Sequence, residues 1–161
     1  MINVRKGNLG NVVMLSNLII ENDVALDCTV GNGHDTRLLA EHVGEKGKVY
    51  GFDIQDQAIE NTKELLSKSN LENRVLLYKE SHEDIDRYVD ELLNIVIYNL
   101  GYLPGSDKSV ITRAKSTVKS IKKSLNLLDT NGILLIASYI GHLGGIEENN
   151  EVENLLAGLN Q

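Results

Sequence analysis

The stretch Val24-Ala25-Leu26-Asp27-Cys28-Thr29-Val30-Gly31-Asn32-Gly33-His34-Asp35-Thr36 decides the fold of this chain. An apolar run ends in an acid, two glycines follow one residue apart, and a helical pattern then begins at Asp35. This order is typical of a strand, a tight loop and the start of a helix. A nucleotide-like ligand can approach the backbone closely at such a loop.

The composition is that of an ordinary globular domain. With 161 residues, of which 42% are hydrophobic and 24% charged, we expect a single domain over residues 1–161. A single cysteine, Cys28, forbids an internal disulfide and is typical of a reducing compartment. No apolar run approaches the roughly 20 residues of a membrane span, so we expect a cytoplasmic protein without a membrane partner. The net charge of −7 argues against a protein that coats nucleic acid, and no DNA partner is expected.

Apolar runs of strand length alternate with helical patterns along the chain. The expected strands are 24–28, 48–53, 74–78, 94–98 and 133–138. The expected helices are 9–21, 35–42, 56–69, 81–92, 109–128 and 147–158, and Asn131-Gly132 is expected to form a turn. Right-handed crossovers then predict an α/β fold, a Rossmann-like doubly wound sheet of five parallel strands with helices on both faces. Ligands of such sheets bind beyond the carboxyl ends of the strands.

A second acid points to an adenosine-containing ligand. Asp53 ends the second expected strand, 20 residues after Gly33, where a carboxylate can accept both ribose hydroxyls. The third glycine of a dinucleotide loop is replaced by Thr36, and Asp27 would repel a pyrophosphate. S-adenosylmethionine, a cation without phosphate, therefore fits better than a dinucleotide. In the alternative, Asp35 only caps a helix and Asp53 is an exposed acid at a strand end.

Four motifs resemble those of class I S-adenosylmethionine-dependent methyltransferases, and more narrowly those of the putative rRNA methylase family. They are Asp27-x-Thr-x-Gly-Asn-Gly-x-Asp-Thr36, Ser81-His82-Glu83, Asn99-Leu-Gly-Tyr-Leu-Pro-Gly-x-Asp-Lys108 and Tyr139-x-Gly-His-x-Gly-Gly145. Members of this family are understood to methylate the aminomethyl group of 5-aminomethyl-2-thiouridine at the tRNA wobble position. The resemblance covers nearly the whole chain.

The resemblance implies a cofactor site made by the glycine loop and the following strand ends. It places the glycine loop around the methionine part, Asp53 on the ribose, and Ser81 and His82 near the adenine. In the alternative, Ser81 caps a helix and His82 points outward. The residues expected to bind the cofactor are Asp27, Thr29, Gly31, Asn32, Gly33, Asp35, Thr36, Asp53, Gln55, Ser81, His82, Asn99 and Gly101.

The acceptor is expected to be an amine. Asn99-Leu100-Gly101-Tyr102 is similar to the (Asp/Asn)-Pro-Pro-(Tyr/Phe) loop of amino methyltransferases, although both prolines are replaced. There a side-chain oxygen and a backbone carbonyl accept the amine hydrogens, and an aromatic ring packs on the target group. The alternative is a plain turn around Gly101 and Pro104. Tyr139 and His142 flank the last strand, and His142 could take the amine proton, bind the base, or only fill the loop. The expected catalytic residues are Asn99, Tyr102, Tyr139 and His142, and no metal site is expected.

A basic stripe lies on the expected helix 109–128, where it could bind an RNA backbone or only form a solvated face. Its members are Lys108, Arg113, Lys115, Lys119, Lys122 and Lys123. With the family resemblance, the stripe predicts tRNA as the substrate.

Class I methyltransferases usually end in an antiparallel hairpin at the sheet edge, and no strand pattern for it follows 133–138. A bare apolar edge strand invites pairing with another chain, so we expect a homodimer. Three functions remain open: an RNA-modifying methyltransferase, a small-molecule amine methyltransferase, and a non-catalytic module that binds the cofactor.

Overall fold

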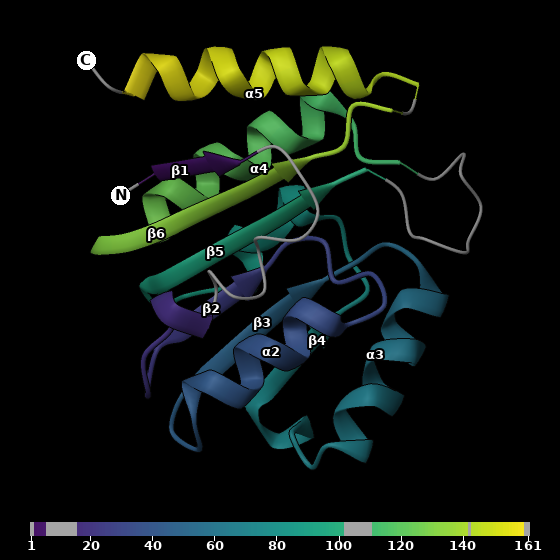
Figure 1. Cartoon of the computed structure of the whole chain (residues 1–161), viewed down its shortest axis with the longest axis vertical. Helices are drawn as coiled ribbons and strands as arrows, with labels where there is room; N and C mark the ends of the chain where they lie inside the picture. The colour runs from purple at the N-terminus through teal and green to yellow at the C-terminus, as the bar shows by residue number, and fades with distance from the viewer. Residues whose placement is uncertain (1, 6–15, 102–110, 142, 160–161) are drawn as a thin grey trace.

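The computed structural model describes residues 2–5, 16–101, 111–141 and 143–159, with the backbone only for 2–5. Figure 1 shows its elements wound around one sheet. In chain order they are β1 (Ile2–Arg5), β2 (Val24–Asp27), α2 (His34–Val43), β3 (Lys48–Phe52), α3 (Asp56–Lys68), the 3-10 turn η1 (Glu72–Arg74), β4 (Val75–Tyr78), the 3-10 helix η2 (His82–Arg87), β5 (Leu93–Leu100), α4 (Ala114–Leu127), β6 (Leu128–Ser138) and α5 (Gly145–Leu159).

The strands form one sheet in the order β1-β6-β5-β2-β3-β4, and every pairing between neighbours is parallel. The five expected strands and the doubly wound fold are confirmed. From β2 the chain proceeds to β3 and β4 on one side, and β5, β6 and β1 lie on the other. The strand order therefore reverses between β2 and β5, where the crevice of an open α/β sheet forms.

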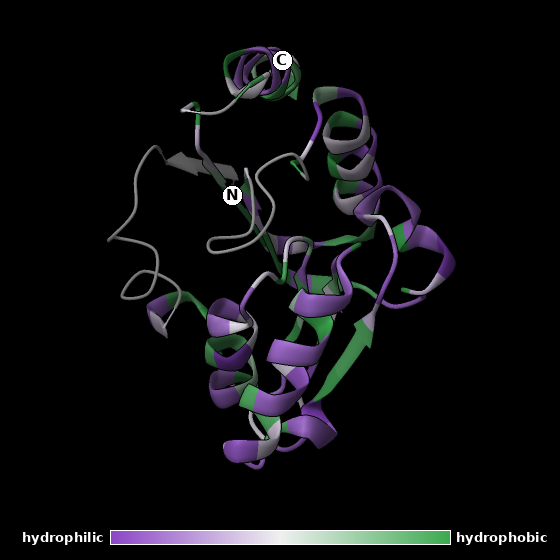
Figure 2. Ribbon diagram, turned by 90° about the vertical axis from the view of Figure 1, so that its right-hand side faces the viewer, coloured by the Kyte–Doolittle hydropathy of each residue, from purple (hydrophilic) through white to green (hydrophobic). Residues whose placement is uncertain are grey.

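Both faces of the sheet are covered, as near-continuous apolar strands predict. In β5, Ile95 and Ile97 face a cluster that includes Leu39 of α2 and Leu66 of α3. Val96 faces the opposite cluster, which includes Ile121 of α4. The same cluster also contains Val152 and Leu156 of α5 and Ile85 of η2. Figure 2 shows mainly hydrophobic strands and helices whose colours change around their axes, as amphipathic helices require.

A sixth strand, β1, was not expected. Its backbone pairs with β6 in the register Ile2↔Leu134 to Arg5↔Ala137. It covers the edge of β6, so the bare edge from which a homodimer was expected is paired within the chain. In the described part of the chain, β6 is followed by α5 and by no antiparallel strand.

Several expected boundaries differ from the structure. Residues 16–18 are helical, and the rest of the expected helix 9–21 lies largely outside the described residues. The helix expected over 81–92 is the shorter 3-10 helix η2, and α4 begins at Ala114 rather than near 109.

Asn131 and Gly132, where a turn was expected, lie within the range of β6, at an irregularity where Gly132 comes close to Leu128 and Asp129. There Leu93 pairs with Leu128 and Ile95 with Ile133, so residues 129–132 face Asn94 alone. A bulge of this kind uses turn-forming residues without ending the strand. None of the described helices combines the length and the apolar character needed to cross a membrane.

Candidate functional site

Side chains from the carboxyl ends of β2 and β5 meet across the point where the strand order reverses. The Asn99 backbone N–H donates to Thr29 Oγ1 at 2.7 Å, and Asn99 Nδ2 donates to Asp35 Oδ2 at 2.7 Å. The loop after β2 and the first turn of α2 are therefore each joined to Asn99, at the end of β5, by one hydrogen bond. This is the crevice in which an α/β sheet binds its ligand.

The glycine loop is held by α3. Gly31 and Gly33 have φ angles of 56° and 79°, in the left-handed region that favours glycine. A Cβ on Gly33 would lie 2.6 Å from Thr62 Oγ1, and that hydroxyl donates to the Gly31 carbonyl at 3.3 Å. Sequence reasoning missed Thr62, whose one signal is a polar residue on the buried face of an amphipathic helix.

Asp27 lies beneath the loop, with no exposed surface. Its carboxylate accepts hydrogen bonds from Thr36 Oγ1 at 2.7 Å and from the Thr29 N–H at 3.1 Å. Burial, and then the negative charge of Asp35, raises the pKa of Asp27 to about 7. Asp27 and Thr36 therefore support the loop from below, and a direct contact between Asp27 and a cofactor stays a prediction.

Asp53 braces the same loop from β3. Its carboxylate accepts hydrogen bonds from the Gly31 N–H at 2.9 Å and from the Gln55 N–H at 3.0 Å, and burial raises its pKa. Asp27, Asp35 and Asp53 are close enough that both of the last two disfavour the ionised form of Asp27. Such a group of carboxyl side chains disfavours a pyrophosphate and suits a cation, which favours their ionised forms. Asn32, between the glycines, accepts a hydrogen bond from Asn61 Nδ2 at 3.1 Å.

His82, at the start of η2, is turned inward, so the outward orientation considered from the sequence is wrong. Its ring meets that of Tyr98 edge-on, with 6.0 Å between the centroids. Burial lowers the pKa of His82 to about 4, so the ring is neutral at pH 7. Its Nδ1 is buried and has no hydrogen-bond partner among the described residues. Ser81 accepts a hydrogen bond from the Glu83 N–H at 3.3 Å, as the capping alternative predicts.

These features fit S-adenosylmethionine as a ligand. The tight glycine loop lies at the carboxyl end of β2, where such sheets bind their ligands, and the surrounding carboxyl groups suit a sulfonium and an ammonium group. The buried, unpartnered Nδ1 of His82 needs a polar partner of the kind that an adenine ring offers.

The acceptor side of the crevice is described only in part, because Tyr102 and His142 lie outside the described residues. Tyr139 follows β6, is 37% exposed, and donates its N–H to the Leu100 carbonyl at 3.1 Å. Desolvation, and then the charge of Asp35, raises the pKa of Tyr139, so the phenol stays neutral. Asn99, Asp35 and Tyr139 thus come from three chain segments to one end of the sheet.

Hydrogen bonds that the sequence did not predict join Gly101, Thr112 and Glu148. The Gly101 N–H donates to Thr112 Oγ1 and the Thr112 N–H to the Gly101 carbonyl, both at 2.9 Å. Thr112 Oγ1 donates in turn to Glu148 Oε2 at 2.7 Å, and Glu148 is 1% exposed. No local pattern predicts these contacts, because Glu148 comes from the distant helix α5.

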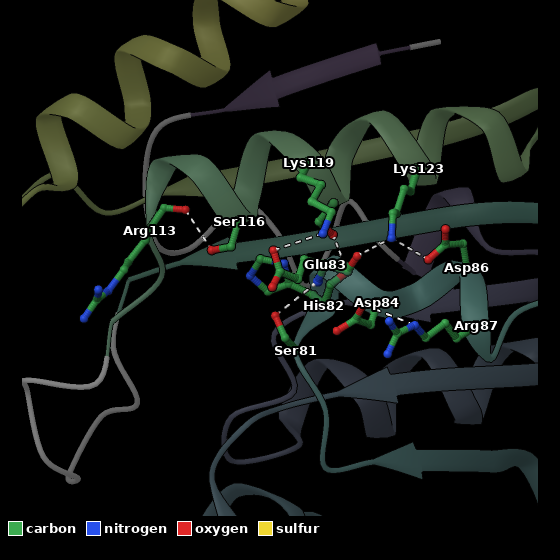
Figure 3. A network of polar contacts seen from close by, with 11 residues as sticks. Ser81, His82, Glu83, Asp84, Asp86, Arg87, Arg113, Ser116, Lys119 and Lys123 are labelled. Carbon is green, nitrogen blue, oxygen red and sulfur yellow. Dashed lines mark hydrogen bonds and ion pairs between the residues drawn. The ribbon is translucent and has the colours of Figure 1, made fainter.

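The basic stripe on α4 is divided by the structure. Figure 3 shows Lys119 and Lys123 pointing from α4 toward η2. Lys119 Nζ lies 3.5 Å from Glu83 Oε2, and Lys123 Nζ lies 2.5 Å from Asp86 Oδ1. Both lysines are thus paired with acids of η2, although Lys119 is also exposed. Arg113, Lys115 and Lys122 are exposed, and Lys108 lies outside the described residues.

Comparisons with known proteins place the chain among methyltransferases. The model of the family described as "Putative rRNA methylase" matches residues 49–161. A chloroplastic tRNA (mnm(5)s(2)U34)-methyltransferase of Arabidopsis thaliana is 37% identical over 157 residues, which cover 91% of this chain and 57% of that protein. The chain thus spans little more than half the length of this relative.

Two solved structures are similar in both sequence and fold. A putative rRNA methylase from Clostridium thermocellum has a TM-score of 0.89 and 42% identity, over 92% of this chain and 80% of that one. A putative methyltransferase from Streptococcus mutans, in complex with SAH, has a TM-score of 0.83 and 38% identity, over 94% of this chain and 81% of that one.

Proposed function

The chain belongs to the putative rRNA methylase family, and on this premise we propose that it is an S-adenosylmethionine-dependent methyltransferase that modifies tRNA. Its proposed substrate is the 5-aminomethyl group of the wobble (2-thio)uridine. The tRNA methyltransferase that is 37% identical to this chain supports the substrate class. The carboxylates around the glycine loop support the cofactor.

The cofactor is assigned to the crevice between β2 and β5. S-adenosylmethionine supplies an electrophilic methyl group on a sulfonium. The glycine loop would hold its methionine part, and the Asp53 carboxylate its ribose. Ser81 and His82 would contact the adenine, where the unpartnered Nδ1 of His82 needs a polar neighbour. The remaining residues assigned to this site are Asp27, Thr29, Asn32, Asp35, Thr36, Gln55, Asn99 and Gly101.

The observation that carries the proposal of an amine acceptor is the hydrogen bond from Asn99 Nδ2 to Asp35. A carboxylate only accepts, so the amide must turn its NH₂ group toward Asp35. Asn99 Oδ1, which accepts no hydrogen bond from the described residues, can then accept a hydrogen from the substrate amine. Such a contact orients the nitrogen lone pair, which an in-line displacement requires.

The remaining chemistry concerns a proton. An amine attacks only when it is neutral, and the nitrogen must release one proton after it is methylated. We assign His142 as the acceptor of that proton, and Tyr139 and Tyr102 as the aromatic surface against the base. Tyr139 supports this assignment because its side chain is partly exposed and lies near the Asp35 carboxylate.

The exposed cations of α4 are assigned to the tRNA backbone. Arg113, Lys115 and Lys122 are available for phosphates, whereas Lys119 and Lys123 are already paired with acids of η2. Lys108, which precedes the helix, is assigned to the same face from the sequence.

A methyl-transfer assay with two acceptors tests the proposal. Labelled S-adenosylmethionine is incubated with the protein and either tRNA that lacks the final methyl or the free 5-aminomethyluridine nucleoside. We expect transfer to the tRNA, at a rate that falls about 10- to 100-fold in Asn99→Ala. Equal transfer to the free nucleoside would instead support a small-molecule amine methyltransferase. Tight cofactor binding without transfer to either acceptor would support a non-catalytic module.

We further propose a single domain over residues 1–161, a cytoplasmic location and a homodimer. The buried free thiol of Cys28 is compatible with a reducing compartment. Because β1 lies outside β6, the two edge strands of the sheet are β1 and β4, and a second copy would pair with one of them. Light scattering tests the dimer, and a monomeric mass at micromolar concentration would contradict it.

A further inference from the structure

The start of η2 is held by two side chains of α4. Ser120 Oγ donates to the His82 carbonyl at 2.8 Å, and Lys123 Nζ donates to the Glu83 carbonyl at 2.6 Å. These two carbonyls are consecutive in the chain, and the two donors are three residues apart on one helix face. Figure 3 shows α4 lying along η2 with Lys123 directed into it.

From this geometry we propose that Ser120 and Lys123 are positioning residues, which hold the backbone of η2 so that His82 is presented to the adenine of the cofactor. This inference rests on the proposed function, because it takes S-adenosylmethionine as the ligand. Ser120 and Lys123 themselves would touch no part of the cofactor.

Three further contacts make this arrangement specific. Ser120 Oγ also lies 2.7 Å from the Tyr98 hydroxyl, and the Tyr98 ring packs against His82. The same serine thus fixes both the backbone of His82 and the ring against which its imidazole rests. Lys123 Nζ also contacts Asp86 Oδ1 at 2.5 Å, which ties the far end of η2 to the same ammonium group.

The apolar contacts of η2 alone do not fix the orientation of its backbone. Ile85, which is 0% exposed, is its one fully buried apolar side chain and anchors the middle of the segment to the core. One such contact fixes a short 3-10 helix at a point but leaves rotation of its flanking peptide groups possible. The hydrogen bonds to the His82 and Glu83 carbonyls remove that freedom where the imidazole begins.

The structure therefore separates two neighbouring lysines that look alike in the sequence. Lys123 is mostly covered and engaged with η2, with a side chain that is 22% exposed. Lys122 lies on the outer face of the same helix and is exposed. Lys122 thus provides a control of identical chemistry one residue away.

The test compares Lys123→Met, Lys123→Arg and Lys122→Met with the unaltered protein in two measurements. Hydrogen–deuterium exchange of residues 82–89 is measured without ligand, and the affinity for SAH is measured by calorimetry. We expect Lys123→Met to speed exchange in this segment and to weaken SAH binding roughly 3- to 10-fold. Lys123→Arg should restore most of both properties, and Lys122→Met should leave both unchanged.

A kinetic split separates positioning from a general structural role. In Lys123→Met the KM for S-adenosylmethionine should rise by the same factor as the SAH dissociation constant, with kcat and the unfolding temperature nearly kept. Ser120→Ala should weaken SAH binding in the same direction. Unchanged SAH affinity in Lys123→Met, or an equal loss in Lys122→Met, would overturn the inference while the proposed function stands. If the unaltered protein bound no SAH, the proposed function and this inference would fail together.

Discussion

Asn99 Nδ2 donates a 2.7 Å hydrogen bond to Asp35 Oδ2, which joins the end of β5 to the first turn of α2 across the point where the strand order reverses. The bond fixes which end of the Asn99 amide faces Asp35 and which end is left for a substrate. The proposed amine chemistry depends on this relationship.

Asn99→Ala is expected to lower kcat for methyl transfer about 10- to 100-fold, because it removes one hydrogen-bond acceptor for the amine. The KM for the cofactor should change less than kcat, since the glycine loop keeps its own supports in Thr62 and Asp53. Steady-state kinetics with the modified tRNA as acceptor measure both constants. An unchanged kcat would exclude Asn99 from the acceptor site.

Asp35→Ala is expected to lower kcat in the same direction, because the Asn99 amide loses the partner that orients it. If Asp35 acts on kcat through Asn99, its removal should have little further effect in the Asn99→Ala background. A double-mutant cycle on kcat measures this coupling. Additive losses would show that Asp35 contributes to turnover independently of Asn99.

Gly33→Ala is expected to reduce the free energy of unfolding by about 1–3 kcal/mol. The φ of 79° is unfavourable for alanine, and the new methyl would lie 2.6 Å from Thr62 Oγ1. Urea denaturation measures the loss. Gly158→Ala, in α5 with nothing within 4 Å of the added Cβ, is the control and should be neutral or slightly stabilising. Equal stability of both variants would contradict the close packing of α3 on the loop.

The free energy of unfolding should depend on pH because the pKa of Asp27 differs between the folded and unfolded states. Its pKa is raised from 3.8 to about 7 in the folded protein, so the folded state keeps a proton that the unfolded chain loses earlier. The resulting stability is complete below about pH 4 and is lost as the pH rises through 7, by at most about 4 kcal/mol. His82 changes the stability in the opposite direction. Its pKa is lowered from 6.5 to about 4, so its contribution to the free energy of unfolding is lost as the pH falls from 6.5 through 4.

Asp27→Asn separates the two effects, because an amide can still accept from the Thr29 N–H and donate to Thr36. Between pH 4 and pH 7 the variant should gain stability relative to the unaltered protein as the pH rises. Urea denaturation at several pH values measures the difference. A difference that does not change with pH would show that the buried carboxyl has an ordinary pKa.

Lys115→Met and Lys122→Met should each weaken tRNA binding and lower the slope of log affinity against log salt by about 0.7–1. Both side chains are exposed on α4 without an assigned acid of η2. Lys63→Met, on the exposed side of α3 beside Glu60, is the control. If all three variants had the same salt slope as the unaltered protein, α4 would not be the RNA-binding face.

The sequence predicts those parts of this fold that depend on local patterns. Apolar runs identify β2 to β6, and the acid and glycine spacing identifies the loop after β2. The strand β1 is missed because Ile2-Asn3-Val4-Arg5 is not a continuous apolar run, unlike most of β2 and β4, and only its pairing with β6 defines it. The turn expected at Asn131-Gly132 falls at an irregularity inside β6, and only the pairing with β5 shows that the strand begins before it, at Leu128.

Contacts between distant segments account for the rest. The spacing of Lys119 and Lys123 on one helix face is predicted by the sequence. Their ion pairs with Glu83 and Asp86 could not be predicted, because these partners come from a segment nearly 40 residues earlier. Likewise, the position of Asp27 beneath the loop depends on Thr36 folding back over it. Local sequence thus indicates which chemistry is present, and tertiary contacts decide which side chains remain available for a ligand.

The most direct measurement of the central claim is mass spectrometry of nucleosides from tRNA that carries a 5-aminomethyl group on its wobble uridine. The tRNA is incubated with S-adenosylmethionine and the unaltered protein, or with Asn99→Ala as the matched control. We predict that the wobble nucleoside alone gains the mass of one methyl group, and that Asn99→Ala forms this product about 10- to 100-fold more slowly. If the protein binds SAH but the wobble nucleoside keeps its mass, the result would contradict the account.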